Sequence, residues 1–296
     1  MHRCVLTPAR RPACSIHLSG RWLARGIASD STTDVRTLRM GRLDGDLKGV
    51  VTLEMANPKA NALGFKLVSE LEAAVRELSQ DESVRAVVVS SGVPGVFCAG
   101  ADLKERAGMS QAESELFVER LRALMTKIAA VPVPTIAAVE GAAYGGGLEM
   151  ALACDLRVVG EKATMGLTET SLGIIPGAGG TQRLPRLIGA SKAKELIFTA
   201  RRLGAARALE LGMVNAVVGA GRAHDEALSM AGDIAKRGPL AIRAAKLAID
   251  QGLLQADSEE GMAVERAMYA RVLETQDRNE GLKAFKERRT PVFTGK

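Results

Sequence analysis

Hydrophobic positions along the first half of the chain follow two different periods. Short runs rich in valine, isoleucine and leucine have the composition of buried strands; they lie at residues 50–55, 84–90, 134–139 and 156–159. Residues 64–80 and 110–130 instead place apolar side chains three and four residues apart, which is the spacing of one helical face. A shorter helix is expected at 148–154. Strands that alternate with helices between glycine turns predict an α/β fold.

The pattern changes after residue 222, where only helical periodicity remains. Four helices are expected there, at residues 227–236, 239–251, 258–275 and 277–287. We therefore expect a core over residues 35–222 and a C-terminal helical subdomain over residues 223–296. No apolar run approaches the roughly 20 residues that a membrane-spanning helix needs, so the sequence predicts no membrane span.

The basic charge of the chain is concentrated at its N-terminus. The formal net charge is +6, but only +1 remains without residues 1–29, which hold no acidic residue and five arginines, Arg3, Arg10, Arg11, Arg21 and Arg25. An arginine-rich, acid-free N-terminus is typical of a mitochondrial transit peptide. Arg25-Gly-Ile27 before Ala28 resembles a matrix-processing site, so we expect a transit peptide over residues 1–27 and a location in the mitochondrial matrix. The alternative is a basic tail without a targeting role.

Cysteine and histidine are scarce in the rest of the chain. Beyond residue 29 there are two cysteines, Cys98 and Cys154, and one histidine, His224. This content excludes a disulfide framework and a zinc site of the usual Cys/His spacing, and no metal is expected. His224 lies in a polar stretch and is interpreted as a surface residue. The chain therefore lacks the positioned histidine that most serine hydrolases use.

Two glycine-rich loops fail the tests for nucleotide binding. A dinucleotide fingerprint needs glycine where the chain has Met150 and Gln182, and neither loop has the Gly-Lys-Ser/Thr of a P-loop. The sequence around Ser191 also lacks the last glycine of a nucleophile elbow. The loops are more consistent with sites where a ligand approaches backbone N–H groups closely.

The same loops could form an oxyanion hole. Gly145–Gly147 precedes the helix expected at 148–154, whose first N–H groups are unpaired and carry the positive end of the helix dipole. A second turn of small residues, 97–102, follows a strand, and one N–H from each loop could bind one carbonyl oxygen. Glu149 and Glu169 lie close by and could divide acid and base work if burial keeps one protonated. Taken alone, each glutamate could equally be structural.

Three motifs, taken in order, resemble the enoyl-CoA hydratase (crotonase) family. They are FCAGADLKE at residues 97–105, GAAYGGGLE at 141–149 and GIIPGAGGTQRLP at 173–185. The resemblance extends from about residue 36 to the C-terminus. It implies a spiral core of repeated ββα units, a C-terminal helical subdomain that mediates trimerisation, and a homohexamer built as a dimer of trimers.

The resemblance also implies roles for individual residues. The N–H groups of Ala101 and Gly146 would hold the thioester oxygen of a trans-2-enoyl-CoA, and Glu149 and Glu169 would be the catalytic glutamates that add water across its C2–C3 double bond. The residues that match CoA-binding positions are Asn61, Ala62, Leu63, Asp102, Leu103 and Lys104, with Phe285 and Arg288 as weaker matches. Coenzyme A is part of the substrate, so no separate cofactor is expected.

Several other functions stay open. Within the family these are methylglutaconyl-CoA hydration, enoyl-CoA isomerisation, which typically needs one carboxylate, and acyl-CoA hydrolysis or decarboxylation; the glutamate pair favours hydration. Binding of AU-rich RNA through a lysine-rich helix is disfavoured, because the matching helix carries more acidic than basic residues and would repel phosphate. A pseudoenzyme retained for assembly is the last alternative. Fatty-acid β-oxidation and leucine degradation both stay open as pathways.

Overall fold

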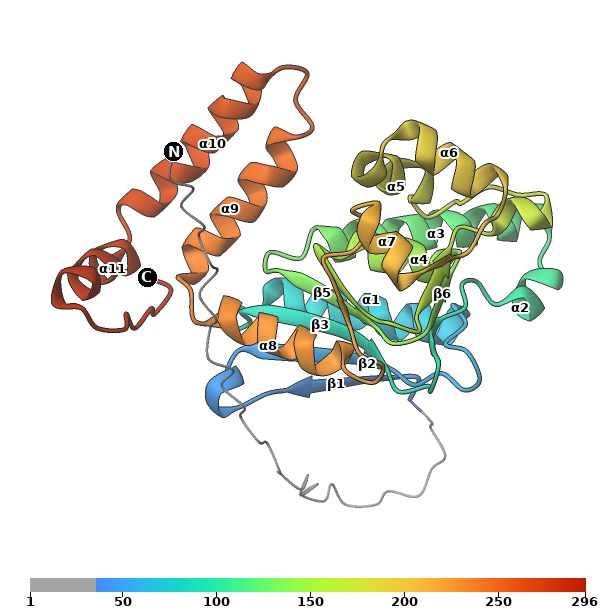
Figure 1. Cartoon of the computed structure of the whole chain (residues 1–296), viewed down its shortest axis with the longest axis horizontal. Helices are drawn as coiled ribbons and strands as arrows, with labels where there is room; N and C mark the ends of the chain where they lie inside the picture. The colour runs from blue at the N-terminus through green and yellow to red at the C-terminus, as the bar shows by residue number, and fades with distance from the viewer. Residues whose placement is uncertain (1–35) are drawn as a thin grey trace, which may run out of the picture. The chain divides into compact units, whose positions relative to one another are not determined.

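Two sheets form the centre of the part of the chain that the computed structural model describes, residues 36–296 (Figure 1). The transit peptide expected over residues 1–27 lies outside these residues. The larger sheet has the order β1-β2-β3-β5-β7-β10, and only β1 runs antiparallel to its neighbour. Its strands are β1 (Leu38–Arg42), β2 (Val50–Met55), β3 (Ala86–Ser91), β5 (Thr135–Val139), β7 (Leu156–Gly160) and β10 (Ala216–Val218).

The smaller sheet is built from short strands in the order β4-β6-β8-β9. These are β4 (Val96–Cys98), β6 (Ala142–Tyr144), β8 (Thr164–Gly166) and β9 (Leu203–Gly204). Three consecutive units, β3-β4-α3, β5-β6-α4 and β7-β8-α5, each place one strand in each sheet before a helix. The helices are α3 (Gln111–Ala129), α4 (Gly146–Ala153) and α5 (Gly180–Ile188). The predicted α/β fold of repeated ββα units is therefore confirmed.

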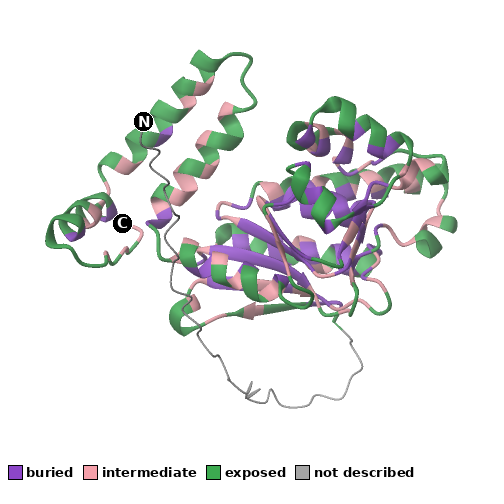
Figure 2. Cartoon of the chain, in the orientation of Figure 1, coloured by how far each residue is buried: buried purple, intermediate pink, exposed green. Residues whose placement is uncertain are grey.

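Both faces of the larger sheet are covered. Successive side chains of a strand point to opposite faces, and in β3 Val87 and Val89 belong to one buried cluster while Ala86 and Val88 belong to another. The first cluster includes the apolar face of α1 (Phe65–Gln80), as its spacing predicted. The second includes alanines of α8 (Ala223–Ala235). Figure 2 shows the resulting continuous buried layer in the sheet.

The three last helices are largely exposed (Figure 2). They are α9 (Pro239–Gly252), α10 (Ser258–Leu273) and α11 (Gln276–Glu287), and α9 packs against α10 as a hairpin. A partly buried ion pair ties α9 to the core, because Lys246 Nζ lies 2.7 Å from Asp155 Oδ2 and donates to Val133 O at 3.2 Å. None of the helices in residues 36–296 is long and apolar enough to cross a membrane.

The remaining elements are short and connect these layers. They are η1 (Gly45–Leu47), α2 (Leu103–Ala107), η2 (Glu169–Leu172), α6 (Ala190–Phe198) and α7 (Ala205–Glu210).

Two helices begin two or more residues earlier than the sequence predicted. The helix α4 begins at Gly146 rather than 148, so the last two glycines of the loop form part of its first turn. The helix α8 begins at Ala223 rather than 227, because Ala223 itself packs on the sheet, and His224 is a half-buried residue of this helix. Since α8 packs on the sheet, the helices that leave the core begin with α9. The domain boundary after residue 222 stays a prediction.

Candidate active site

Ala101 presents an unpaired backbone N–H three residues after β4 ends. It forms a parallel bridge with Leu63, whose N–H donates to Gly100 O at 2.8 Å and whose carbonyl accepts from the Asp102 N–H at 3.3 Å. Leu63 thus bonds the neighbours of Ala101, and the N–H of Ala101 itself points to the other side. It has no acceptor within residues 36–296 and is available to a ligand.

Gly146 supplies a second unpaired N–H, because it is the first residue of α4. The first helical bond of α4 runs from the Glu149 N–H to Gly145 O at 2.9 Å, so Gly146 has no helical acceptor. Gly100 allows the two loops to approach: a Cβ there would lie 2.8 Å from Tyr144 O and 3.3 Å from Gly146 N. Its φ of +93° also falls in the left-handed region that favours glycine. Glycine at position 100 is therefore required for the pairing.

Glu149 is a buried carboxylate that reaches from α4 to the next glycine loop. Its side chain is only 3% exposed, and Oε1 accepts from the N–H groups of Ala178 at 2.8 Å and Gly180 at 2.7 Å. Burial is the largest influence on the pKa of Glu149 and raises it above its ordinary value, and the two N–H donors favour the charged form and limit this rise. Its Oε2 has no hydrogen-bond partner among the described residues and is free to act on a ligand.

Glu169 has a different environment. It begins η2, it is half-buried, and its buried Oε2 has no hydrogen-bond partner in the described part of the chain. Burial, together with the nearby charge of Glu149, raises the pKa of Glu169 to about 7. A carboxyl with such a pKa is partly protonated at neutral pH and can donate a proton.

All four of these groups line one cavity. Ala101, Gly146, Glu149 and Glu169 lie on the wall of a cavity of about 1530 Å³. The wall also carries exposed apolar residues, Leu103, Leu172, Ile174, Ile175, Leu253 and Leu254. Its basic residues are Arg106, Arg122, Arg183, Arg186 and Arg202. The cavity thus combines two backbone donors, two carboxylates, an apolar wall and positive charge.

The predicted CoA-binding residues that follow Ala101 differ in whether they line the cavity. Leu103 lines the cavity, and Lys104 beside it is exposed. Asp102 caps α2 by accepting from the N–H groups of Lys104 at 2.9 Å and Glu105 at 3.2 Å. These residues shape the loop that carries Ala101.

The residues predicted before α1 are more deeply placed. Leu63 and Asn61 are fully buried, and Ala62 between them is partly exposed, with its carbonyl accepting from Asn57 Nδ2 at 2.8 Å. The Asn61 amide donates to Ser91 Oγ at 2.8 Å and Phe97 O at 3.0 Å. The polar groups of Asn61 are therefore used within the fold, and a role in CoA binding would act through the loop it holds.

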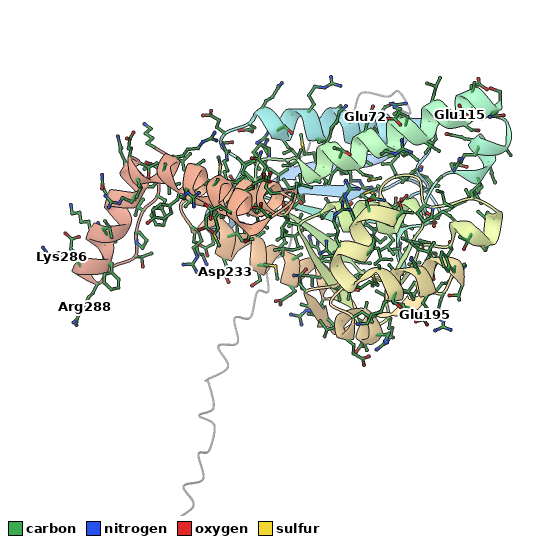
Figure 3. All side chains as sticks on the ribbon, turned by 90° about the horizontal axis from the view of Figure 1, so that it is seen from above. Glu72, Glu115, Glu195, Asp233, Lys286 and Arg288 are labelled. Atoms are coloured by element: carbon green, nitrogen blue, oxygen red, sulfur yellow. The ribbon has the colours of Figure 1, made fainter. Side chains whose placement is uncertain are left out.

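Phe285 and Arg288 are not brought to the cavity. Phe285 is 86% exposed on α11, and Arg288 follows at the end of that helix. Figure 3 shows Arg288 at the outer end of α11, with its side chain directed into solvent. Neither residue lines the cavity, so their contact with CoA stays a prediction.

Sequence reasoning did not identify three groups that hold Glu149. These are the N–H groups of Ala178 and Gly180 and the side chain of Arg183, which bonds Ala178 O at 3.1 Å. They lie 29 to 34 positions beyond Glu149, and no spacing rule connects them. The one indication in the sequence was the glycine-rich run at 177–180. It matches no nucleotide-binding motif, so its glycines indicate that the backbone there makes a close contact of another kind.

Comparisons with known proteins agree with this geometry. Residues 46–296 match the family model for enoyl-CoA hydratase/isomerase. The chain is 51% identical to human mitochondrial enoyl-CoA hydratase domain-containing protein 2, over 92% of this chain and 95% of that protein. It is 49% identical to human mitochondrial methylglutaconyl-CoA hydratase, over 92% and 81% of the two chains.

A solved structure gives the same result. The crystal structure of enoyl-CoA hydratase from Bacillus anthracis superposes with a TM-score of 0.85 and 44% identity, and the match covers 88% of this chain and all of the other. The resemblance inferred from the three motifs is therefore confirmed. The chain belongs to the enoyl-CoA hydratase/isomerase family.

Proposed function

We propose that this protein is an enoyl-CoA hydratase, which adds water across the C2–C3 double bond of a trans-2-enoyl-CoA to give a 3-hydroxyacyl-CoA. One observation carries the proposal: two carboxylates with unlike environments face one cavity beside two unpaired backbone N–H groups. Isomerisation and hydrolysis would use the same N–H groups, but neither needs both carboxylates.

The two N–H groups would act on the thioester carbonyl. Attack of water at C3 moves negative charge onto the carbonyl oxygen, and the N–H groups of Ala101 and Gly146 would bind that oxygen as the charge develops. The Gly146 N–H also lies at the N-terminus of α4, where the helix dipole stabilises an anion. One such donor contributes on the order of 3 kcal/mol to the reduction of the barrier.

The two glutamates would divide the proton transfers. Glu149 is held by two N–H donors that favour its charged form, so its Oε2 accepts a proton from water as the water oxygen bonds to C3. Glu169, whose pKa is about 7, donates its proton to C2. Turnover leaves Glu149 protonated and Glu169 charged, and transfer of one proton from Glu149 to Glu169 through solvent restores the starting state.

We propose a mitochondrial location and a homohexamer on the same basis. The two human relatives are named as mitochondrial proteins, and the arginine-rich sequence of residues 1–27 supports import. Exposed apolar residues on α9–α11, among them Leu282 and Phe285, support burial of these helices between subunits. Fatty-acid β-oxidation and leucine degradation are both compatible with the reaction.

A second substrate is favoured by one feature of the cavity. The acyl chain of methylglutaconyl-CoA ends in a free carboxylate, and the cavity wall includes the exposed guanidinium groups of Arg122 and Arg186. Arginine is well suited to bind carboxylates. The relative rates with crotonyl-CoA and 3-methylglutaconyl-CoA would distinguish the two substrate classes.

The decisive test is the loss of enoyl-thioester absorbance when the purified protein is mixed with crotonyl-CoA. We expect rapid loss in the wild type and loss of at least about 100-fold of the rate in Glu169→Gln, because the proton donor is removed. No loss with a folded wild type, for either crotonyl-CoA or 3-methylglutaconyl-CoA, would contradict hydration. Formation of a shifted double bond instead would identify an isomerase.

A further inference from the structure

The loop that holds Glu149 is itself held by two arginines from different helices. Residues 177–180 connect η2 to α5, and this loop supplies both N–H donors to Glu149 Oε1. From α5, Arg183 Nη1 donates to Ala178 O at 3.1 Å. From α3, Arg122 Nε donates to Gly177 O at 3.1 Å. Ala178 therefore joins Arg183 to Glu149, because its carbonyl accepts from the first and its N–H donates to the second.

The loop is shaped to receive the Arg183 side chain. A Cβ at Gly179 would lie 2.0 Å from Arg183 Nη1, so only glycine allows the guanidinium to lie against the backbone there. Gly179 also has a φ of +112°, which a residue with a side chain rarely adopts. Its carbonyl accepts from the Arg183 backbone N–H at 2.9 Å, which begins α5. The turn is thus closed on both sides by the same arginine.

The charge of Arg183 is directed at Glu149. Arginine stays protonated in proteins, and Arg183 has no carboxylate within ion-pair distance in the described part of the chain, whereas Arg122 is paired with Glu119. The charged groups that act on Glu149 are Arg183 and Arg122, which favour its charged form, and Glu169, whose own pKa the charge of Glu149 raises. Of the two arginines, Arg183 is the more buried and has the larger influence on Glu149.

We propose that Arg183 is a positioning residue for the hydration reaction: it closes the loop that orients Glu149 and keeps the Glu149 carboxylate charged. This inference rests on the proposed function in one respect: hydration requires the Glu149 carboxylate to be charged. Arg183 lines the same cavity, but no contact with the acyl chain is required for this role.

The test compares pH profiles of kcat/KM for crotonyl-CoA in three variants. Arg183→Gln removes the charge and the guanidinium fork, Arg183→Lys keeps the charge, and Arg207→Gln is the control. Arg207 of α7 is exposed, pairs with Glu210 at 2.7 Å and does not line the cavity.

Removal of the positive charge raises the pKa of Glu149. As the pH is lowered, Arg183→Gln should therefore lose activity at a higher pH than the wild type does. We expect this acid limb to move up by about one pH unit, with kcat about tenfold lower on the plateau because the carboxylate is less well oriented. Arg183→Lys should restore most of the acid limb but not the plateau rate, and Arg207→Gln should match the wild type. The basic limb, which depends on Glu169, should not move in any variant.

Two results would overturn the proposal. One is an unshifted acid limb in Arg183→Gln with a rate that falls by the same factor at every pH, which is what a purely structural role predicts. The other is a shift in Arg207→Gln equal to that in Arg183→Gln. If Arg183→Gln does not fold, an acid limb and plateau of wild-type form in Arg183→Lys would overturn the positioning role.

A measurement without turnover separates this proposal from the proposed function. Infrared titration reports the protonated carboxyl of Glu149 as the band absent from Glu149→Gln. In Arg183→Gln this band should persist to a higher pH than in the wild type, whether or not the protein hydrates crotonyl-CoA. If the wild type is inactive but the band shifts in Arg183→Gln, the hydratase function is rejected and the role of Arg183 is supported. If the wild type is active but the band does not shift, hydration is supported and the role of Arg183 is rejected.

Discussion

The two glutamates that face the cavity differ in burial and in their hydrogen-bond partners. Glu149 is nearly fully buried, yet its Oε1 receives two N–H donors from the loop at 177–180. Glu169 is less buried, yet its Oε2 has no partner in the described chain and its pKa rises to about 7. Burial alone therefore does not set the charge of a carboxylate, because hydrogen-bond donors can offset the cost of desolvation.

In the proposed reaction this difference would supply an acid and a base from the same residue type. A pair of carboxyl groups with separated pKa values is a recurring arrangement in enzymes that need both functions at neutral pH. Here burial raises the pKa of both carboxyl groups, and the two N–H donors from the loop at 177–180 limit the rise at Glu149. The following predictions alter one side of the comparison at a time.

The largest effect is expected from removal of the base. Glu149→Gln keeps an oxygen that can accept from Ala178 and Gly180, so the loop should stay folded, but no group can take the proton from water. We expect kcat for crotonyl-CoA to fall by about 10²- to 10⁴-fold. The residual activity should keep a basic limb, because Glu169 is intact, and should lose the acid limb. A variant with wild-type kcat would show that Glu149 is only structural.

An intermediate effect is expected on stability and its pH dependence. Because the folded-state pKa of Glu169 is raised from 4.5 to about 7, the native state binds the proton more tightly, and stability falls as the pH rises through this range. Glu169→Gln removes this loss. Because the side chain is not fully buried, the free energy of unfolding at pH 8 should increase by about 1 to 2 kcal/mol, with little change at pH 4.5.

Thermal unfolding at the two pH values checks this prediction, and Glu195→Gln is its control. Glu195 lies on the surface of α6 (Figure 3), where it pairs with Arg201 at 2.6 Å. The control should not gain stability at pH 8. Equal melting temperatures for wild type and Glu169→Gln at pH 8 would mean that Glu169 has an ordinary pKa.

The smallest effect concerns the loop that carries Ala101. Glu105 of α2 accepts from the N–H of Phe65 at 2.8 Å and so connects this loop to the start of α1. Glu113 caps α3 in a similar way, by accepting from the Ser110 N–H at 2.8 Å, but it has no contact with the loop. Each change to alanine should lower the melting temperature slightly, because a backbone N–H at the start of a helix loses its acceptor. Only Glu105→Ala should also lower kcat, by about fivefold, because the Ala101 N–H is less well fixed. Equal kcat in both variants would show that Glu105 does not position it.

The sequence predicted the long elements and the two glutamates, and physical reasons explain what it missed. The strand β2 and the helix α1 are long enough to show a period, whereas β4, β6 and β8 have three residues each and show none. Glu149 was identified because it follows a glycine-rich turn. Its partners come from a loop 29 to 31 residues later, and only the folded chain brings them together.

Arg183 illustrates the same limit. It stands within a motif that identified the family, but its position in the sequence does not indicate that its guanidinium lies against Gly179 and Ala178. By contrast, Phe285 and Arg288 were expected near CoA from the resemblance, and they lie away from the cavity of their own chain.

The most direct test of the account is a carboxyl titration of the protein labelled with ¹³C-glutamate, with the two resonances assigned by their absence from Glu149→Gln and Glu169→Gln. We predict that Glu169 titrates near pH 7 while Glu149 is already charged at that pH. Titration of Glu169 near 4.5, or of Glu149 at a higher pH than Glu169, would contradict the division of acid and base between them.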